Sequence, residues 1–549
     1  MPSRTNPRSA SVVFCQPHTD FLNDINMNTN FTKFFVFLFA IASFAACSNK
    51  KGTDENYKMG LTFDDAGYNK IPKKATLTRA LYDNLPSSAS LQQFCPKVER
   101  QNNQTCVGWS SSYYARTILY AREKQLSGTS QISDNTFSPG FTYRAASMVL
   151  KDVDLDCGNG SLIDVAMQIM QRFGVLKYND FREECYQGEI SEELVARANP
   201  YRIQTFTRLI DASDSREIQL KKLKKSLAEG NPVLIGMETM PSFLRCRSEI
   251  WQPEGGESSL GGHAICVMAY DDNKAGGAFQ IINSWGTAWG NNGFAWIKYD
   301  DFFRYVRYAC EMVVNIPPPP KPQPEIPKTE PKPEPKKEEP KPAPAPVVVQ
   351  KSYLSGQLKL VLDSGNEMPI SSQRVGNMDV VPANTPKPTP ITPTNTRNYF
   401  AYKAAQPYPS GTRFRIYLDN NEPAYVYAFS MDNTRKTSLL FPYNSNISPV
   451  LNYAKNTVAL PDEDHYIQLD NQTGTDILCL LYSKDALDIG QICQQMEGQE
   501  GTFFEILYKT LNGKIIAPNF IQYEEGNMKF KAEVQNGFVV PIVVEVSHK

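Results

Sequence analysis

Residues 281–294 read IINSWGTAWGNNGF. This stretch predicts an apolar strand that ends at Asn283, followed by a loop rich in glycine and tryptophan. An amide side chain at such a strand end is able to accept a hydrogen bond from an imidazole and so fix the tautomer of the ring. Trp285 is placed to cover that bond and to keep water away from it. The stretch therefore predicts a site that also contains a histidine.

Histidine is scarce in this chain, which narrows the choice of that residue. The four histidines are His18, His263, His465 and His548. His263 alone lies between the apolar amino-terminal segment and a proline-rich stretch that begins at Pro317. It follows two glycines and precedes the apolar run AICVMAY, which predicts a strand. If this part of the chain uses a histidine base, the base is His263.

A cysteine stands before a predicted helix in the stretch QNNQTCVGWS, residues 101–110. Trp109, Tyr113, Thr117 and Tyr120 fall on one face of that helix, which places Cys106 at its amino end. The N–H groups and the dipole at a helix start favour a thiolate over a thiol, and the thiolate is the nucleophilic form. Taken alone, a single cysteine near a helix start is more often a core residue.

Together the three stretches resemble the papain family of cysteine peptidases, in the order Cys, His, Asn. The resemblance extends over roughly residues 85–314. It implies an α+β fold with a helical half and a β-barrel-like half, and it implies hydrolysis of peptide bonds. By the same resemblance Cys106 is the nucleophile, His263 the general base and acid, Asn283 the residue that orients the imidazolium, and Trp285 the shield of that pair.

The resemblance also implies an oxyanion donor. Gln101 is the candidate, together with the backbone N–H of Cys106. The family's glutamine stands six residues before the cysteine, whereas Gln101 stands five before it and Arg100 occupies the sixth place. Gln104 is therefore a competing candidate.

A glycine-rich turn and several cysteines complete the comparison with the family. Cys157-Gly158-Asn159-Gly160 resembles a turn that lines the family's substrate cleft. The implied substrate-binding residues are Gly158, Asn159, Gly160, Gly262 and Trp285. A bridge between Cys157 and Cys185 is implied by family members that bridge a similar region, and Cys246–Cys310 is a second candidate pair. Cys266 is expected to be a buried free thiol, and buried unpaired cysteines remain the alternative for the others.

The amino end predicts export. Residues 27–47 combine Lys33 with an apolar run from Phe34 to Ala46, which is typical of a signal peptide and too short to span a bilayer. Ala45-Ala46-Cys47 resembles a bacterial lipoprotein box, which implies cleavage before Cys47 and lipidation of its thiol. A plain secretory signal is the alternative. Residues 1–26 are interpreted as a mis-assigned upstream segment, with Met27 as the true start.

The remaining boundaries follow from composition. Residues 48–84 are expected to be a tether and amino-terminal extension. The segment from Cys47 to Cys106 is too short for the family's usual long inhibitory propeptide, so a zymogen is not evident. Residues 85–316 are the peptidase domain. Residues 317–350 form a Pro/Lys/Glu-rich linker, since 14 of the 39 prolines lie in 317–346. Residues 351–549 are expected to be mostly β and resemble a bacterial β-rich domain of unknown function.

Local patterns predict elements in both domains. Apolar spacing predicts helices over 161–174, with a capping box formed by Ser161 and Asp164, and over 214–230. Strands are predicted at 233–237, 263–270, 278–283 and 294–299. In the second domain Phe414, Ile416 and Leu418 alternate with polar residues. Tyr425, Tyr427 and Phe429 alternate next, either as a binding face or as the core face of a strand.

Charge and motif content exclude several functions. The 57 basic and 58 acidic side chains give a net charge of -1, which argues against a nucleic-acid binder. No CxxC pair occurs, so zinc ribbons have no support, and no cofactor is expected. The sequence predicts a peptidase acting on peptides or proteins and held by a lipid anchor in the bacterial envelope (outer membrane or periplasm), or secreted. An unknown envelope partner is expected for the second domain. An inactive binding lipoprotein and an acyl transferase are the alternatives.

Overall fold

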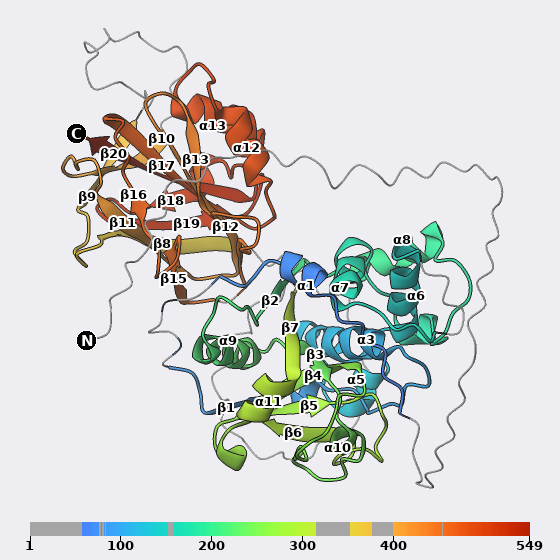
Figure 1. Ribbon diagram of the computed structural model, residues 1–549. Helices are drawn as coiled ribbons and strands as arrows, with labels where there is room; N and C mark the ends of the chain where they lie inside the picture. Colours follow the sequence, from blue (N-terminus) through green and yellow to red (C-terminus); the bar gives the residue numbers. More distant parts are fainter. Residues whose placement is uncertain are drawn as a thin grey trace, which may run out of the picture.

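The structure is a computed structural model with two folded domains (Figure 1). The predicted signal peptide, Cys47 and the predicted proline-rich linker lie outside the described residues. The structure describes residues 57–75, 78, 82, 84–151, 157–314, 352–375, 399–452 and 454–549.

The first domain contains a helical half. The helix that follows Cys106 is continuous over α3, η2 and α4, and its η2 segment is π-helical. The helices of this domain are α1 Asp65–Lys70, α3 Cys106–Gly108, η2 Trp109–Arg116, α4 Thr117–Glu123, α5 Thr129–Ser133, α6 Pro139–Val149, α7 Ile163–Arg172, α8 Glu192–Ala198, α9 Arg216–Ala228, α10 Pro241–Leu244 and α11 Tyr299–Tyr305, with 3-10 turns η1 Gln92–Phe94, η3 Tyr178–Asp180, η4 Asn199–Tyr201 and η5 Lys274–Gly276.

Two helix predictions are tested by these bounds. Helix α7 is present, but its N-cap is Leu162 and no side chain caps it, so the capping box predicted at Ser161 is wrong. Gly174 ends the helix as expected, with φ of 84° and its N–H bonded to the carbonyl of Ile169. Helix α9 begins after Ser215, whose hydroxyl accepts the N–H of Ile218.

An antiparallel sheet forms the other half of the first domain. Its order is β2-β7-β3-β4-β5-β6, with β1 paired to β4. The four strands predicted from the sequence correspond to β3, β4, β5 and β6, and that prediction is confirmed. The strands are β1 Ser88–Ser90, β2 Thr205–Arg208, β3 Val233–Glu238, β4 Gly262–Asp271, β5 Ala278–Ile282, β6 Phe294–Lys298 and β7 Val306–Val313.

The second domain is mostly β, as predicted. Two sheets, β13-β12-β17-β20-β10-β9 and β15-β11-β8-β19-β18, enclose one apolar core, and α12 and α13 cover the other face of the first sheet (Figure 1). Its elements are β8 Tyr353–Leu362, β9 Ile370–Val375, β10 Tyr399–Ala404, β11 Arg413–Asn420, β12 Ala424–Met431, β13 Thr437–Phe441, β14 Val450–Leu451, β15 Asn456–Leu460, β16 Ile467–Gln468, β17 Gly474–Ser483, α12 Ile489–Met496, α13 Phe503–Leu511, η6 Pro518–Phe520, β18 Ile521–Tyr523, β19 Met528–Glu533 and β20 Val539–His548.

Strand β12 decides between the two interpretations of its aromatic residues. Tyr425, Tyr427 and Phe429 are buried in the core that the sheet shares with α12 and α13. Their alternation therefore marks a core face and not a binding face.

Part of the amino-terminal extension lies between the two domains. Lys73 donates its N–H to the carbonyl of Asn446 at 2.6 Å, and its own carbonyl accepts the N–H of Ser448 at 2.9 Å. Close by, the side chain of Asn452 donates to the carboxylate of Glu311 on β7 at 3.2 Å. The extension is thus bonded to the second domain, and the second domain is bonded directly to the first.

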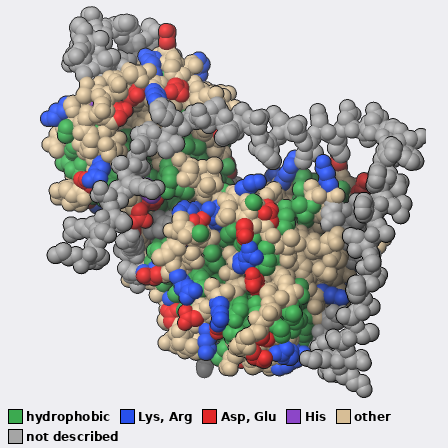
Figure 2. Space-filling model, viewed as in Figure 1, with side chains coloured by type: hydrophobic (Ala, Val, Ile, Leu, Met, Phe, Trp, Pro, Cys, Tyr) green, Lys and Arg blue, Asp and Glu red, His purple; other side chains and the backbone are tan. Residues whose placement is uncertain are grey.

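The visible surface carries both signs of charge. Figure 2 shows Lys and Arg side chains interspersed with Asp and Glu on the face in view, in both domains. Within the described ranges, no helix combines the length and the apolar character needed to cross a membrane.

Candidate active site

Two neighbouring strands bring His263 and Asn283 together. His263 is the second residue of β4, and Asn283 directly follows β5, which pairs with β4. Nε2 of His263 lies 2.8 Å from Oδ1 of Asn283. The same oxygen accepts the N–H of Ser284 at 2.8 Å, which identifies it as the carbonyl atom of the amide. Nε2 is therefore the protonated ring nitrogen, and Nδ1 is the nitrogen able to accept a proton.

Cys106 contacts the residue that follows His263. Its Sγ accepts a hydrogen bond from the N–H of Ala264, the residue after His263, at 3.4 Å. Nδ1 of His263 is buried and has no hydrogen-bond partner. The structure thus brings the three predicted residues together from a helix start and two strands.

Aromatic rings cover the pair of His263 and Asn283. The ring of Trp285 stacks on the imidazole, with centroids 4.3 Å apart and planes 20° apart. The ring of Tyr57 stacks on Trp285 at 4.9 Å. Nε1 of Trp285 donates to the carbonyl of Lys58 at 2.8 Å. Trp285 lies where the resemblance placed it, and residues of the amino-terminal extension lie against it.

Residues 57–63, which we call the strap, run between β4 and the glycine turn before α7. We call these two flanks the walls of the site and the space between them the cleft. On one wall, the N–H of Leu61 donates to the carbonyl of Gly262 at 3.2 Å. On the other, the carbonyl of Gly60 accepts the N–H of Ser161 at 2.8 Å, and the N–H of Thr62 donates to the carbonyl of Ser161 at 3.0 Å. The extension expected to be a tether therefore contains a segment that fills the cleft.

The strap fits closely at two positions. Gly60 has φ of 140°, and a Cβ added there would collide with the carbonyl of Gln104. Leu61 is 6% exposed, and its Cδ2 approaches to 2.7 Å from the place where a Cβ on Gly236 would stand. A residue larger than glycine at position 60 is therefore incompatible with the observed position of the strap.

Burial under the strap changes the ionisation of both reactive groups. Cys106 and His263 are each 0% exposed. Burial raises the pKa of Cys106 to about 12, although the N–H of Ala264 acts in the other direction. Burial lowers the pKa of His263 to about 4, although the bond to Asn283 opposes the shift. The helix start was expected to favour a thiolate; in this closed arrangement loss of solvation outweighs it, and both groups are neutral.

Gln101 lies beside the asparagine loop. Its N–H donates to the carbonyl of Ser284 at 2.8 Å, and its Oε1 accepts the hydroxyl of Ser284. Its Nε2 donates one hydrogen to the carbonyl of Asn103 at 2.8 Å, which leaves the second hydrogen for another acceptor. Gln104 donates its N–H to the carbonyl of Cys157 at 3.0 Å, and its carbonyl faces Gly60.

The glycine turn forms one wall of the covered cleft. Gly160 lies against the carbonyl of Gly60, and Gly262 stands on the opposite wall. Gly158 and Asn159 are exposed.

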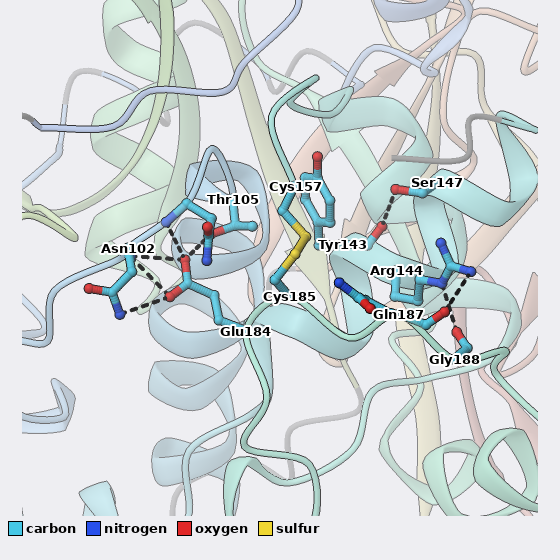
Figure 3. The surroundings of a disulfide bond; sticks show 11 residues. Asn102, Thr105, Tyr143, Arg144, Ser147, Cys157, Glu184, Cys185, Gln187 and Gly188 are labelled. Atoms are coloured by element: carbon cyan, nitrogen blue, oxygen red, sulfur yellow. Dashed lines mark hydrogen bonds between the residues drawn. A yellow bond between two sulfur atoms is a disulfide. The ribbon is translucent and has the colours of Figure 1, made fainter. Parts of the chain in front are cut away.

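A disulfide joins Cys157, at the start of this turn, to Cys185 (Figure 3). Cys246 and Cys310 are both free, so the second pairing considered from the sequence is wrong, and Cys266 is a buried free thiol. Cys246 and Cys310 lie in the apolar core of the domain, which accounts for their burial without a bridge. In the described part of the chain, no group of three or more His, Cys, Asp or Glu side chains is arranged to hold a metal ion.

Sequence reasoning missed the strap and one further residue, Glu184. The aromatic and apolar side chains of Tyr57, Leu61 and Phe63 give a signal for the strap, because a solvated tether does not need them. Glu184 has no local signal, since it contacts a loop 79 to 82 positions away along the chain.

Comparison with known proteins gives the class of the first domain. Residues 147–313 match the family described as "Papain family cysteine protease", and residues 407–486 match a domain of unknown function, DUF4384. The first match includes His263 and Asn283 and begins after Cys106. The chain thus carries a papain-family cysteine peptidase domain and a DUF4384 domain in its carboxy-terminal part.

Individual relatives are distant. An uncharacterised peptidase C1-like protein of Acanthamoeba polyphaga mimivirus is 24% identical over 250 residues, which covers 43% of this chain and 75% of that protein. Cysteine proteinase 3 of Entamoeba histolytica is 32% identical over 94 residues, 17% of this chain and 30% of that protein. Xylellain, a cysteine protease from Xylella fastidiosa, has a TM-score of 0.39 at 19% identity, covering 49% of this chain and 99% of that chain.

Proposed function

We propose that this protein is a cysteine peptidase that hydrolyses peptide bonds with Cys106, His263 and Asn283. The observation that carries the proposal is the arrangement of these three side chains. Nε2 of His263 is held by Oδ1 of Asn283 at 2.8 Å, Nδ1 is left without a partner, and Sγ of Cys106 accepts the N–H of Ala264, the residue after His263. A thiol next to an imidazole of fixed tautomer is the arrangement that generates a sulfur nucleophile.

The reaction follows from these positions. Nδ1 of His263 takes the thiol proton, and Sγ of Cys106 attacks the peptide carbonyl carbon. The N–H of Cys106 and the side-chain amide of Gln101 are the proposed donors to the resulting oxyanion. His263 then gives its proton to the leaving amine, and a thioester remains. Water attacks the thioester, His263 accepts a proton from the water and returns it to sulfur, and the carboxylic acid product leaves.

Substrate entry requires that the strap leave the cleft. Its backbone occupies hydrogen-bonding groups of Gly262 and Ser161 on both walls, and the thiol and imidazole beneath it are fully buried. The arrangement described here is therefore a closed form, and the active form has the strap displaced. The same backbone groups on the two walls then become available to an extended peptide.

Gly60→Ala separates the closed form from the open form. The added methyl group collides with the carbonyl of Gln104, so we expect the strap to be displaced, which takes Tyr57 and Leu61 out of the first domain's core. We expect this variant to hydrolyse a peptide library at least about tenfold faster than the parent chain. Gly255→Ala is the control, because this loop glycine lies outside the left-handed φ region and has nothing within 4 Å of an added Cβ, and we expect it to change nothing. No hydrolysis by an opened chain would contradict the proposal. Product masses with and without an added amine separate hydrolysis from acyl transfer.

We further propose that Cys47 is lipidated and anchors the protein in the bacterial envelope. The disulfide between Cys157 and Cys185 supports an oxidising compartment. Labelling cells with a fatty-acid analogue tests the anchor: the chain is labelled, and Cys47→Ser is not. A chain that is exported and unlabelled would indicate a plain secretory signal instead. The carboxy-terminal domain is proposed to bind an envelope partner.

A further inference from the structure

We propose that Glu184 is a positioning residue that holds the nucleophile in place. Its carboxylate accepts several hydrogen bonds from the loop directly before Cys106. Oε1 accepts the N–H of Asn102 at 3.1 Å and that of Asn103 at 3.0 Å, and it also accepts the hydroxyl of Thr105 at 2.5 Å. Oε2 accepts the N–H of Asn102 at 3.0 Å and its side-chain amide at 3.4 Å. Figure 3 shows Asn102 and Thr105 both turned toward this carboxylate.

The middle of the loop depends on Glu184 for its shape. Residues 101–105 form neither helix nor strand; the N–H groups of Gln101 and Gln104 donate to the carbonyls of Ser284 and Cys157, whereas those of Asn102 and Asn103 donate to Glu184 and would otherwise need water. Thr105 is the N-cap of the helix that begins at Cys106, yet its side chain makes no capping bond. Its hydroxyl donates to Glu184 instead. One carboxylate therefore fixes the residue before the nucleophile and two residues beside Gln101.

Glu184 is itself held from two sides. Its neighbour Cys185 is bonded to Cys157, whose carbonyl accepts the N–H of Gln104. The backbone of residues 183–184 lies so close to Gly140 that any Cβ there would collide with it. The nucleophile loop, the glycine turn of the cleft wall and the segment around Glu184 thus form one linked unit (Figure 3).

The consequence for catalysis is geometric. If the loop shifts, the N–H of Cys106 and the amide of Gln101 no longer point at the oxyanion, although β4 still holds His263 and β5 still holds the neighbouring Asn283. A hydrogen-bond donor that no longer points at the oxyanion lowers the rate of the chemical step more than it weakens substrate binding. The hydrogen bonds of Glu184 go to Asn102, Asn103 and Thr105 and not to the thiol or the imidazole, so it acts through the loop.

We test the inference by substituting Glu184 in the full chain that carries Gly60→Ala. The inference rests on the proposed function only for its kinetic readout. Glu184→Ala is expected to lower kcat by about 10- to 100-fold, the effect of losing hydrogen bonds to a charged acceptor, with KM changed less than about threefold. Glu184→Gln keeps one acceptor oxygen and is expected to recover kcat to within about fivefold of the parent. Glu183→Ala, an exposed neighbour, is the matched control and leaves kcat unchanged.

A second readout does not depend on activity. Hydrogen exchange at the N–H groups of Asn102 and Asn103 is expected to be at least about tenfold faster in Glu184→Ala and near the parent rate in Glu184→Gln. If hydrogen exchange is faster in Glu184→Ala but the Gly60→Ala chain hydrolyses no peptide, the proposed function is contradicted and the positioning role of Glu184 is supported. Parent-like exchange and kcat in Glu184→Ala would overturn the inference. A loss of kcat that Glu184→Gln does not recover would also overturn the inference, as would an equal loss of kcat in Glu183→Ala. If Glu184→Ala does not fold, the kcat and the exchange rates of Glu184→Gln are compared with those of Glu183→Ala instead.

Discussion

The two sides of the cleft hold their reactive groups by different means. His263 and Asn283 lie on or next to β4 and β5, whose backbone ladder fixes them. Cys106 follows an irregular loop that depends on the side chain of Glu184 and on the bridge between Cys157 and Cys185. A ladder spreads its support over many backbone bonds, whereas the loop relies on a few side-chain contacts. We call the side that carries Cys106 the loop side and the side that carries His263 and Asn283 the strand side. Single substitutions are therefore expected to disturb the loop side more easily than the strand side.

The largest expected effect comes from removing the nucleophile itself. Cys106→Ala in the Gly60→Ala chain is expected to reduce peptide hydrolysis by at least about 10³-fold, because no other group forms the thioester. Circular dichroism and thermal unfolding are expected to match the parent, since the loop contacts remain. Residual hydrolysis near the parent rate would show that another group does the chemistry.

Removing the disulfide tests the loop side alone. Cys157→Ser with Cys185→Ser opens a bridge with a sequence separation of 28. The chain-entropy model gives a loss of about 3–4 kcal/mol in the free energy of unfolding of the first domain. Hydrogen exchange is expected to quicken at Gln104 and to stay slow in β4 and β5. Equal loosening of both sides would contradict the comparison.

Asn283→Ala tests the strand side. The imidazole loses the acceptor that fixes its tautomer, yet β4 still holds the ring near Cys106. We expect kcat to fall by about 30-fold without loss of the fold, which is less than for the nucleophile. Measured kcat and far-ultraviolet spectra check this. A variant as inactive as Cys106→Ala, and unfolded as well, would assign Asn283 a structural role instead.

Acid is expected to open the strap. The pKa of His263 falls from the ordinary 6.5 to about 4 in the closed form, so between these values the open form binds a proton that the closed form does not. Lowering the pH through this range therefore favours the open form, by up to about tenfold per pH unit. Tryptophan fluorescence of Trp285 against pH follows the change, and Gly60→Ala lacks it. Opening that strengthens with rising pH would contradict the sign.

Sequence patterns predicted the strand side well and the loop side poorly. Asn283, Trp285 and His263 stand within short local patterns, and the strands that carry them show apolar runs that a single sequence reveals. The position of Cys106 at a helix start was likewise readable from the spacing of Trp109 and Tyr113. These features depend on neighbours a few residues away, which is why they were predictable.

Features built by distant contacts escaped prediction. The contacts of Glu184 with the nucleophile loop join positions about eighty apart, and the strap reaches Gly262 across most of the domain. The prediction of a capping box at Ser161 was wrong because Leu162, not Ser161, occupies the N-cap position of α7. Helices α12 and α13 were missed in a domain expected to be mostly β, although Thr502 and Glu505 form a capping box visible in the sequence.

Alkylation of Cys106 tests most directly whether the thiol and imidazole act as one unit. The Gly60→Ala chain is treated with iodoacetamide beside Gly60→Ala with His263→Ala, and intact mass and peptide mapping follow the label. The expected result is one label on Cys106, formed at least about tenfold more slowly without His263. Equal rates in the two chains, no faster than that of free cysteine, would contradict the account.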